Sequence, residues 1–278
     1  MCNGRRVDNR DKPAMTVNNA EPMTHANAKP DTVTAALVVI GEEILSGRTN
    51  DENIAYIGAY LARTGISLRE VRVVADHEGD IAAAVNELRP RFAYVFTTGG
   101  IGPTHDDVTT DAIAKAFGVG VRLDEGAVQA LRKHFNEAEL TPARLRMARI
   151  PEGAELIDNA ISRAPGYRIG NVIVMAGVPR IMQVMLDAVM PGLDKGRPML
   201  TQSVRIDAPE GDVASPLAAL QAAHPQVQIG SYPFFEQKRL GTYVVLRATG
   251  EKDLEAAYEA LWIVIVENGL AAVRSETR

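Results

Sequence analysis

The chain has 278 residues, 46% of them hydrophobic and 23% charged, with a formal net charge of −5 at pH 7. These values are typical of one large globular domain or two unequal ones, and the acidic balance argues against a nucleic-acid-binding protein. The single cysteine, Cys2, excludes an intramolecular disulfide and a thiolate metal cluster. No apolar run approaches the roughly 20 residues of a membrane span, and residues 1–31 lack the apolar core of a signal peptide. We therefore expect a cytoplasmic protein.

The first 33 residues are polar, include Pro13, Pro22 and Pro30, and show no period of 2 or 3.6 residues. Such a segment cannot bury enough apolar surface to fold. Residues 1–33 are therefore predicted to be a disordered tail. Met15 and Met23 leave open that the true start lies downstream of Met1.

Short apolar runs predict the strands of a sheet, at residues 35–40, 71–74, 92–96 and 172–175. Continuous apolar runs suit strands that are buried on both faces. Amphipathic helical patterns lie between and after them, over residues 54–61, 81–88 and 182–189. Gly65 can end the first helix, Pro90 stops the second, and Pro179 suits the first turn of the third. The alternation predicts a parallel sheet with helices on both faces.

Glycine and proline cluster between Pro191 and Pro198, which predicts a domain boundary. Beyond it we expect, in order, a strand at Val204 and Ile206, a helix over residues 213–220, a short strand at Val227 and Ile229, a longer strand over residues 243–248 and a helix over residues 254–265. These elements predict a small βαββα domain of the α+β class. The expected domains are residues 34–195 and 200–272.

The most informative stretch is Thr97-Thr98-Gly99-Gly100-Ile101-Gly102-Pro103-Thr104-His105-Asp106-Asp107, directly after a predicted strand. Glycines allow a ligand to approach the backbone N–H groups, and a helix start near Thr109 favours anions. The stretch has neither the P-loop nor the dinucleotide-binding spacing. It predicts a phosphate site, and the alternative is a tight turn without a ligand.

Two other segments also follow predicted strands: Gly41-Glu42-Glu43 and Gly177-Val178-Pro179-Arg180. Ligands of open α/β sheets bind beyond the carboxyl ends of the strands, so both segments should share an edge with the glycine-rich loop. The Arg180 guanidinium could pair with a phosphate. Asn50 and Asn53 could hydrogen-bond a base, a pterin ring or a ribose, whereas Asn50 or Asp51 could instead cap the following helix.

Asp106 and Asp107 beside a phosphate site need an explanation, because two carboxylates repel an anion. A divalent cation between the two would remove the repulsion, and Glu42 and Glu43 could complete its ligands. The competing interpretation is that one of the aspartates caps the next helix. His105 is expected to be an exposed loop residue, and the histidine spacings do not match a catalytic zinc site.

Several of these motifs, in this order, resemble the molybdopterin-binding-like domain of the CinA family, which is related to MoaB and Mog proteins. Residues 39–53, 97–109 and 175–179 carry the resemblance, which covers about residues 34–195. Gly230-Ser231-Tyr232-Pro233 resembles, more loosely, the small domain that follows in that family. The resemblance implies a three-layer α/β/α domain with a mostly parallel sheet. It also implies that Asp107 matches the critical aspartate of the MoaB–Mog loop.

The sequence departs from the family pattern in three places. Glu42 replaces the usual Asp, and His105 stands where Lys is common. The chain ends at Arg278 without the deamidase domain of many CinA proteins, so deamidase activity is not expected.

In CinA proteins the domain resembles a metal-dependent ADP-ribose pyrophosphatase, so we expect that activity on ADP-ribose or a similar dinucleotide. The alternative is a non-catalytic protein that binds a pterin or nucleotide phosphate, linked to molybdenum cofactor biosynthesis. The expected catalytic residues are Asp107 and Asp106, and Glu42 joins them as a ligand of Mg²⁺, Mn²⁺ or Co²⁺. The expected ligand-binding residues are Thr98, Gly99, Gly100, Gly102, Thr104, Asn50, Asn53, Gly177, Pro179 and Arg180. No nucleic acid or membrane partner is expected, and homo-oligomerisation is left open.

Overall fold

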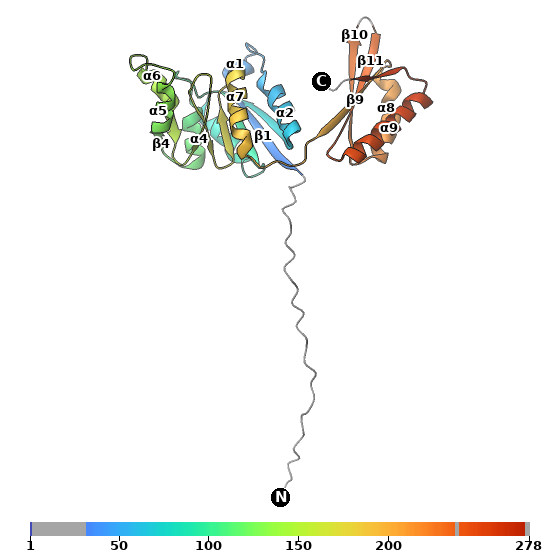
Figure 1. Cartoon of the computed structure of the whole chain (residues 1–278), viewed down its shortest axis with the longest axis horizontal. Helices are drawn as coiled ribbons and strands as arrows, with labels where there is room; N and C mark the ends of the chain where they lie inside the picture. The colour runs from blue at the N-terminus through green and yellow to red at the C-terminus, as the bar shows by residue number, and fades with distance from the viewer. Residues whose placement is uncertain (2–31, 237–238, 276–278) are drawn as a thin grey trace.

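The computed structural model describes Met1, residues 32–236 and residues 239–275. The predicted tail lies outside these residues, except for Met1, Thr32 and Val33, which is the first residue of a strand. Two lobes follow one another along the chain (Figure 1). Within the described residues, no helix is long and apolar enough to cross a membrane.

The larger lobe is built on a six-stranded sheet in the order β2-β1-β3-β8-β7-β6. Its parallel part comprises β1 (Val33–Ile40), β2 (Ile66–Val74), β3 (Tyr94–Thr98) and β8 (Val172–Met175). All four strands were predicted, and β2 begins five residues earlier than expected. The remaining strands, β7 (Gly166–Ile169) and β6 (Glu155–Ile157), are antiparallel. The prediction of a mostly parallel sheet is confirmed.

Helices cover both faces of this sheet, as predicted. On one face, α2 (Asn53–Thr64) and α7 (Pro179–Val189) pack with Leu37 and Val39 of β1. On the other face, α3 (Glu78–Leu88) and α4 (Thr109–Phe117) pack with Val38 and Ile40 of the same strand. The alternation follows from the two-residue period of a strand. Met182 and Met185 of α7 are core residues, as expected.

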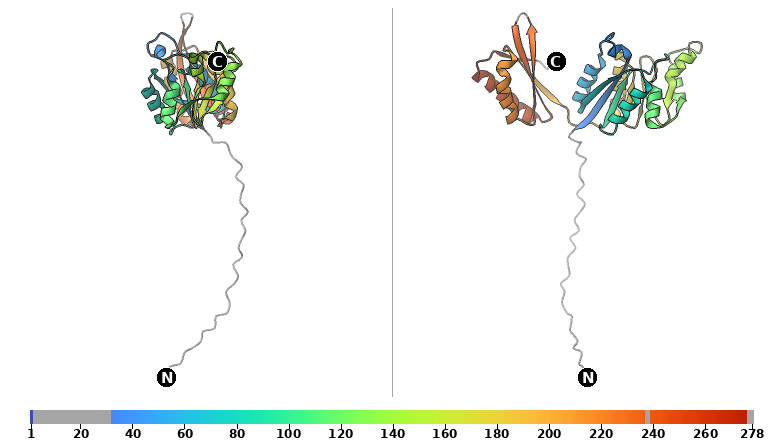
Figure 2. Two further views of the ribbon diagram at one scale, coloured as in Figure 1. Left: turned by 90° about the vertical axis from the view of Figure 1, so that its left-hand side faces the viewer. Right: turned by 180° about the vertical axis from the view of Figure 1, so that it is seen from behind.

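Smaller elements complete the larger lobe, several of them at the end farthest from the second lobe (Figures 1 and 2). They are α1 (Glu42–Leu45), β4 (Val121–Leu123), α5 (Glu125–Arg132), α6 (Pro142–Leu145), β5 (Arg149–Pro151) and two 3₁₀ turns, Arg146–Ala148 and Met190–Gly192. Strands β4 and β5 form a separate antiparallel pair.

The second lobe is an antiparallel sheet in the order β10-β11-β9-β12, with two helices on the face away from the larger lobe (Figure 2). Its elements are β9 (Leu200–Ile206), α8 (Glu210–Ala223), β10 (Gln228–Glu236), β11 (Arg239–Ala248), α9 (Glu251–Glu267) and β12 (Ala272–Ser275). The predicted βαββα order is found, but the structure adds β12, which pairs with β9.

The segment between the lobes lies against the C-terminal end of α2. The Gly196 N–H donates to the Gly65 carbonyl over 3.0 Å, and the Met199 N–H donates to the Ala62 carbonyl over 3.1 Å. Gly65 ends α2 in the left-handed region at φ 86°, as predicted, and a Cβ there would lie 2.3 Å from the Gly196 oxygen. These bonds satisfy carbonyls that a helix end otherwise leaves free.

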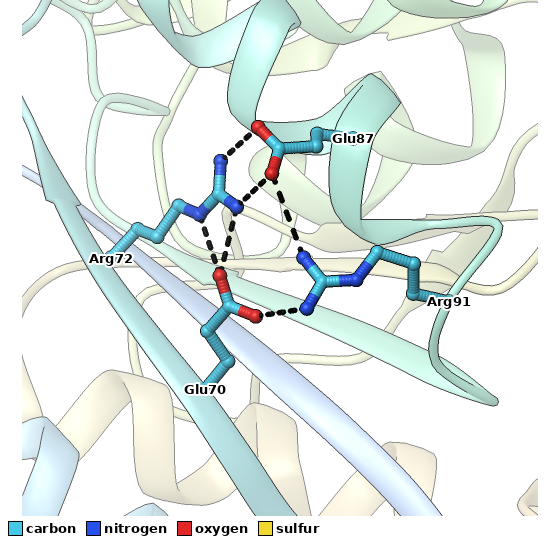
Figure 3. Close-up of polar contacts among 4 residues, drawn as sticks. All are labelled: Glu70, Arg72, Glu87 and Arg91. Carbon is cyan, nitrogen blue, oxygen red and sulfur yellow. Dashed lines mark hydrogen bonds and ion pairs between the residues drawn. The ribbon is translucent and has the colours of Figure 1, made fainter.

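The exposed edge strand β2 carries a charged network with α3 (Figure 3). Arg72 donates to Glu87 over 2.7 Å and to Glu70 over 2.9 Å, and Arg91 donates to Glu70 over 2.7 Å. The hydrogen bond from Arg72 is the main reason that the pKa values of Glu70 and Glu87 are below their usual range. Charged side chains on an edge strand hinder pairing with another chain.

Candidate functional site

The carboxyl ends of β1, β3 and β8 meet closely, because these strands are neighbours in the sheet. A Cβ on Gly99 would lie 2.1 Å from the Ile40 oxygen, and a Cβ on Gly177 would lie 3.2 Å from the Gly99 Cα. The Gly99 N–H donates to the Met175 carbonyl over 3.1 Å. Gly41, Thr97 and Gly177 share one edge of the sheet, as predicted, but of the three only Gly177 lines the cavity at that edge, so the expectation that all three line one pocket is wrong.

The glycine-rich loop needs its glycines for conformation. Gly99 and Gly100 have φ values of 107° and 65°, which side chains rarely allow. Thr109, the first residue of α4, fixes the loop: its N–H donates to the Gly100 carbonyl and its Oγ1 to the Gly99 carbonyl, each over 3.0 Å. Gly102 is outside the left-handed region, but a Cβ there would lie 2.7 Å from the Asp107 carboxylate.

A cavity of about 640 Å³ opens at this edge of the sheet. Ten of the predicted site residues line it: Asn50, Asn53, Thr98, Gly99, Gly100, Gly102, Asp106, Asp107, Gly177 and Pro179. The other three, Glu42, Thr104 and Arg180, are not among the lining residues. Arg180 is exposed on α7, and its phosphate role stays a prediction.

Helix geometry explains why Glu42 and Arg180 do not line the cavity. Successive residues of an α-helix project about 100° apart. In α1, Glu43 therefore lines the cavity and Glu42 does not; in α7, Pro179 lines the cavity and Arg180 does not. Glu42 contributes through its backbone instead, because its N–H donates to the Asp76 carboxylate over 2.8 Å.

Asp76 was missed by the sequence analysis, although it follows β2 and the strand-end rule could have found it. Burial raises the pKa of the Asp76 carboxyl, and the negative charges of Glu43, Asp106 and Asp107 raise it further, against a lowering by the Glu42 N–H. The four carboxylates thus share one region of negative potential. Asn159 and Ser162 also line the cavity, from a loop without a recognisable sequence signal.

Asp107 is held by Thr104 rather than by the helix. The Thr104 N–H donates to the Asp107 Oδ2 over 2.8 Å, and the Thr104 hydroxyl donates to the same oxygen. Helix α4 has Val108 at its N-cap position, without a side-chain cap. The capping interpretation of Asp106 and Asp107 is therefore wrong, and Thr104 positions the aspartate. His105 is exposed, as expected.

Asp51 supplies the cap of α2, because the Ile54 N–H donates to its Oδ1 over 2.7 Å. Asn53, 4% exposed, has a different role. Its Nδ2 donates to the Gly177 carbonyl over 2.8 Å, whereas its Oδ1 is buried without a partner among the described residues. The free acceptor suits a ligand hydroxyl or N–H rather than a phosphate oxygen.

The charged side chains that line the cavity are all acidic. Its described lining includes six carboxylates, on Glu43, Asp51, Glu52, Asp76, Asp106 and Asp107, and no Lys, Arg or His. A phosphate would enter this region only with a cation. Carboxylate oxygens are the donors that hard divalent cations prefer. Within the described residues, however, no three His, Cys, Asp or Glu side chains already form a metal-binding group.

This fold and site define a known class of protein. Residues 36–195 match the family model described as "Probable molybdopterin binding domain", and the chain belongs to that family. Residues 198–271 match a second model, described as "FAD synthase, middle domain".

The relatives of the chain include CinA proteins. A crystal structure of CinA, of unknown function, from Thermoplasma acidophilum is 37% identical over 57% of this chain and 98% of that chain, with a TM-score of 0.54. A CinA-like protein of Desulfosudis oleivorans is 36% identical over 70% of this chain. A protein of T. acidophilum is 39% identical over 55% of this chain. The matches span 51% and 62% of the lengths of those two relatives.

Proposed function

We propose that this protein hydrolyses the pyrophosphate bond of ADP-ribose or a similar dinucleotide with the help of a divalent metal ion. One observation carries the proposal: a cavity at the strand ends is lined by carboxylates and a glycine-rich loop, without a cationic side chain among its described lining. A binder of anions has no need of such an acidic lining. A metal-dependent hydrolase does, because its cation must be held by the protein.

Asp107 and Asp106 would hold the metal ion, together with Asp76 and Glu43, which take the place expected for Glu42. A bound divalent ion lowers the pKa of its water and neutralises phosphate charge. The chain's own residues orient the substrate: the loop from Gly99 to Gly102 offers backbone N–H groups to phosphate oxygens. The free Oδ1 of Asn53 accepts a hydrogen bond from a ribose hydroxyl or a base N–H.

A second candidate is a binding protein without turnover, whose ligand is a pterin or nucleotide phosphate. The description of the matched family, a probable molybdopterin binding domain, favours the pterin. The same cavity would then hold the ring against its apolar lining, which includes Ile44, Ile101 and Ile181. This candidate needs no water-activating group.

The two candidates differ in turnover. The test incubates the purified full chain with ADP-ribose in Mg²⁺, Mn²⁺, Co²⁺ or EDTA; the protein is then removed, excess Zn²⁺ and Mg²⁺ are added to every sample, and an alkaline phosphatase releases phosphate from any product. The proposal expects phosphate release with at least one metal and none in EDTA, since the phosphatase attacks the products, AMP and ribose 5-phosphate, and not ADP-ribose. Binding of ADP-ribose or molybdopterin by calorimetry without phosphate release in any metal would favour the binding protein.

A further inference from the structure

A second cavity, of about 940 Å³, lies between the two lobes. One wall is formed by α2 and the start of β2, and the other by the segment after Gly196 and the ends of β10 and β11. Figures 1 and 2 show α2 as the helix of the larger lobe that faces the smaller one. The volume is within the range of small-molecule sites, about 300–1,000 Å³.

Arginines from both lobes line this interlobe cleft: Arg63, Arg69, Arg197 and Arg247. Its described lining contains no Asp or Glu. Arg63, Arg69 and Arg247 form no ion pair with a described carboxylate, in contrast to Arg72, Arg149 and Arg205 elsewhere in the chain. A concentration of positive charge in a chain of net charge −5 therefore faces an open volume.

The position of Arg69 depends on an irregularity of β2. Ala35 pairs with Leu68 and Ala36 pairs with Glu70, so Arg69 is an extra residue in the β1–β2 ladder. A bulge of this kind redirects a side chain out of the regular alternation. Arg69 lines the cleft, while Glu70 and Arg72 belong to the charged network with α3 (Figure 3).

The rest of the cleft is apolar or neutral. Ile54, Leu68 and Met199 supply apolar surface, and the side chains of Gln226 and Gln228 supply amides. Arginine guanidinium groups pair with phosphate oxygens through two hydrogen bonds at once, and apolar side chains pack against a ring. We propose that the interlobe cleft binds a small ligand with two or more phosphate groups, such as a nucleoside triphosphate.

This site is chemically distinct from the cavity at the strand ends. That cavity has no cationic side chain in its described lining, so it needs a metal ion to attract a phosphate. In the cleft, arginine side chains of the protein itself supply positive charge. In EDTA, phosphate binding should therefore occur at the cleft alone, which separates this proposal from the proposed hydrolase activity.

The test is calorimetry of the full chain in EDTA, with inorganic triphosphate and with ATP as probes. We expect one site per chain that weakens as salt increases, with tighter binding of ATP if the apolar wall contacts the nucleoside. Arg69 and Arg247 lie on opposite walls of the cleft. Arg69→Gln and Arg247→Gln should each weaken binding about tenfold or more, since each removes a charge-assisted contact.

Two control variants remove the same charge at the far end of the larger lobe: Arg122→Gln in β4 and Arg132→Gln in α5. Both should bind the probes as wild type does. Equal weakening by the controls would show a general charge effect and overturn the proposal. So would loss with only one of Arg69→Gln and Arg247→Gln, absence of binding in EDTA, or binding of an RNA oligonucleotide in preference to both probes.

Discussion

The side-chain amide of Asn53 donates to the carbonyl oxygen of Gly177 over 2.8 Å, across 124 positions of sequence. The bond joins the first turn of α2 to the loop after β8. It therefore connects two segments that line the cavity. It also fixes which way the amide points, because Nδ2 is committed to Gly177, and Oδ1 is left buried without a partner among the described residues. The Asn53 side chain thus makes a structural hydrogen bond through Nδ2 and keeps an unpaired acceptor, Oδ1.

We predict that Asn53→Asp both destabilises the protein and weakens binding of ADP-ribose. Aspartate cannot donate to the Gly177 carbonyl, and loss of a buried hydrogen-bond partner costs about 1–3 kcal/mol. Denaturant unfolding measures the first effect and calorimetry the second. Asn50→Asp is the matched control, since Asn50 is exposed and should keep wild-type stability. Equal stability of the two variants would contradict the role of the Asn53 bond.

Gly99→Ala should destabilise the larger lobe and disrupt the cavity. The added methyl group would meet the Ile40 carbonyl oxygen at 2.1 Å, in a backbone conformation with φ 107°. Strain of this kind costs about 1–3 kcal/mol before the clash is counted. Gly211→Ala in α8 is the control: a Cβ there meets nothing within 4 Å, so the change should be neutral or stabilising. Thermal unfolding compares the two, and a Gly99→Ala protein as stable as wild type would exclude the close approach.

The sequence predicted those strands that appear as long, continuous runs of apolar residues. Strands β1, β3 and β8 are buried on both faces and therefore appear as continuous apolar runs. Strands β6, β7 and β12 have three or four residues each, too few to show a period. Strand β10 is longer than the sequence indicated, because Gly230 and Pro233 interrupt the alternation and none of its residues is buried.

The sequence predicted which strand ends carry the site, but not which individual side chains line the cavity. The rule that ligands bind beyond the carboxyl ends of parallel strands located the loop from Thr97 to Asp107. It did not decide between Glu42 and Glu43, which depends on the helical rotation of α1. It also did not reveal the interlobe cleft, because Arg69 and Arg247 come together only through the packing of two lobes.

The charged network of β2 and α3 should make stability depend on pH in acid. The pKa values of Glu70 and Glu87 are lowered from 4.5 in the folded protein, mainly by the hydrogen bonds from Arg72. A lowered folded-state pKa contributes stability above the unfolded value, and this contribution is lost as the pH falls through the folded value. Arg72→Gln should therefore be less stable than wild type at pH 7, and the difference should vanish well below pH 4.5.

Urea unfolding from pH 7 to pH 3 measures this difference. Arg132→Gln, which breaks one exposed ion pair with Glu137, serves as the control and should change little at any pH. A stability difference for Arg72→Gln that is the same at both ends of the pH range would show that packing of the arginine, and not its charge, matters.

Asp107→Asn should keep the melting temperature of the wild type and lose metal-dependent hydrolysis of ADP-ribose. Asparagine can still accept the bond from the Thr104 N–H, and the aspartate caps no helix, so little stability is at stake. The change removes a negative charge and a base, and acid–base catalysis alone contributes about 10²–10⁴-fold. Asp106→Asn, at an exposed position of the same loop, should be affected less. If Asp107→Asn turns over ADP-ribose normally, the assignment of Asp107 to the chemistry fails. If the wild type releases no phosphate with any divalent metal, Asp107→Asn should still change the affinity for a nucleotide or pterin, because its carboxylate lines the cavity that would hold the ligand.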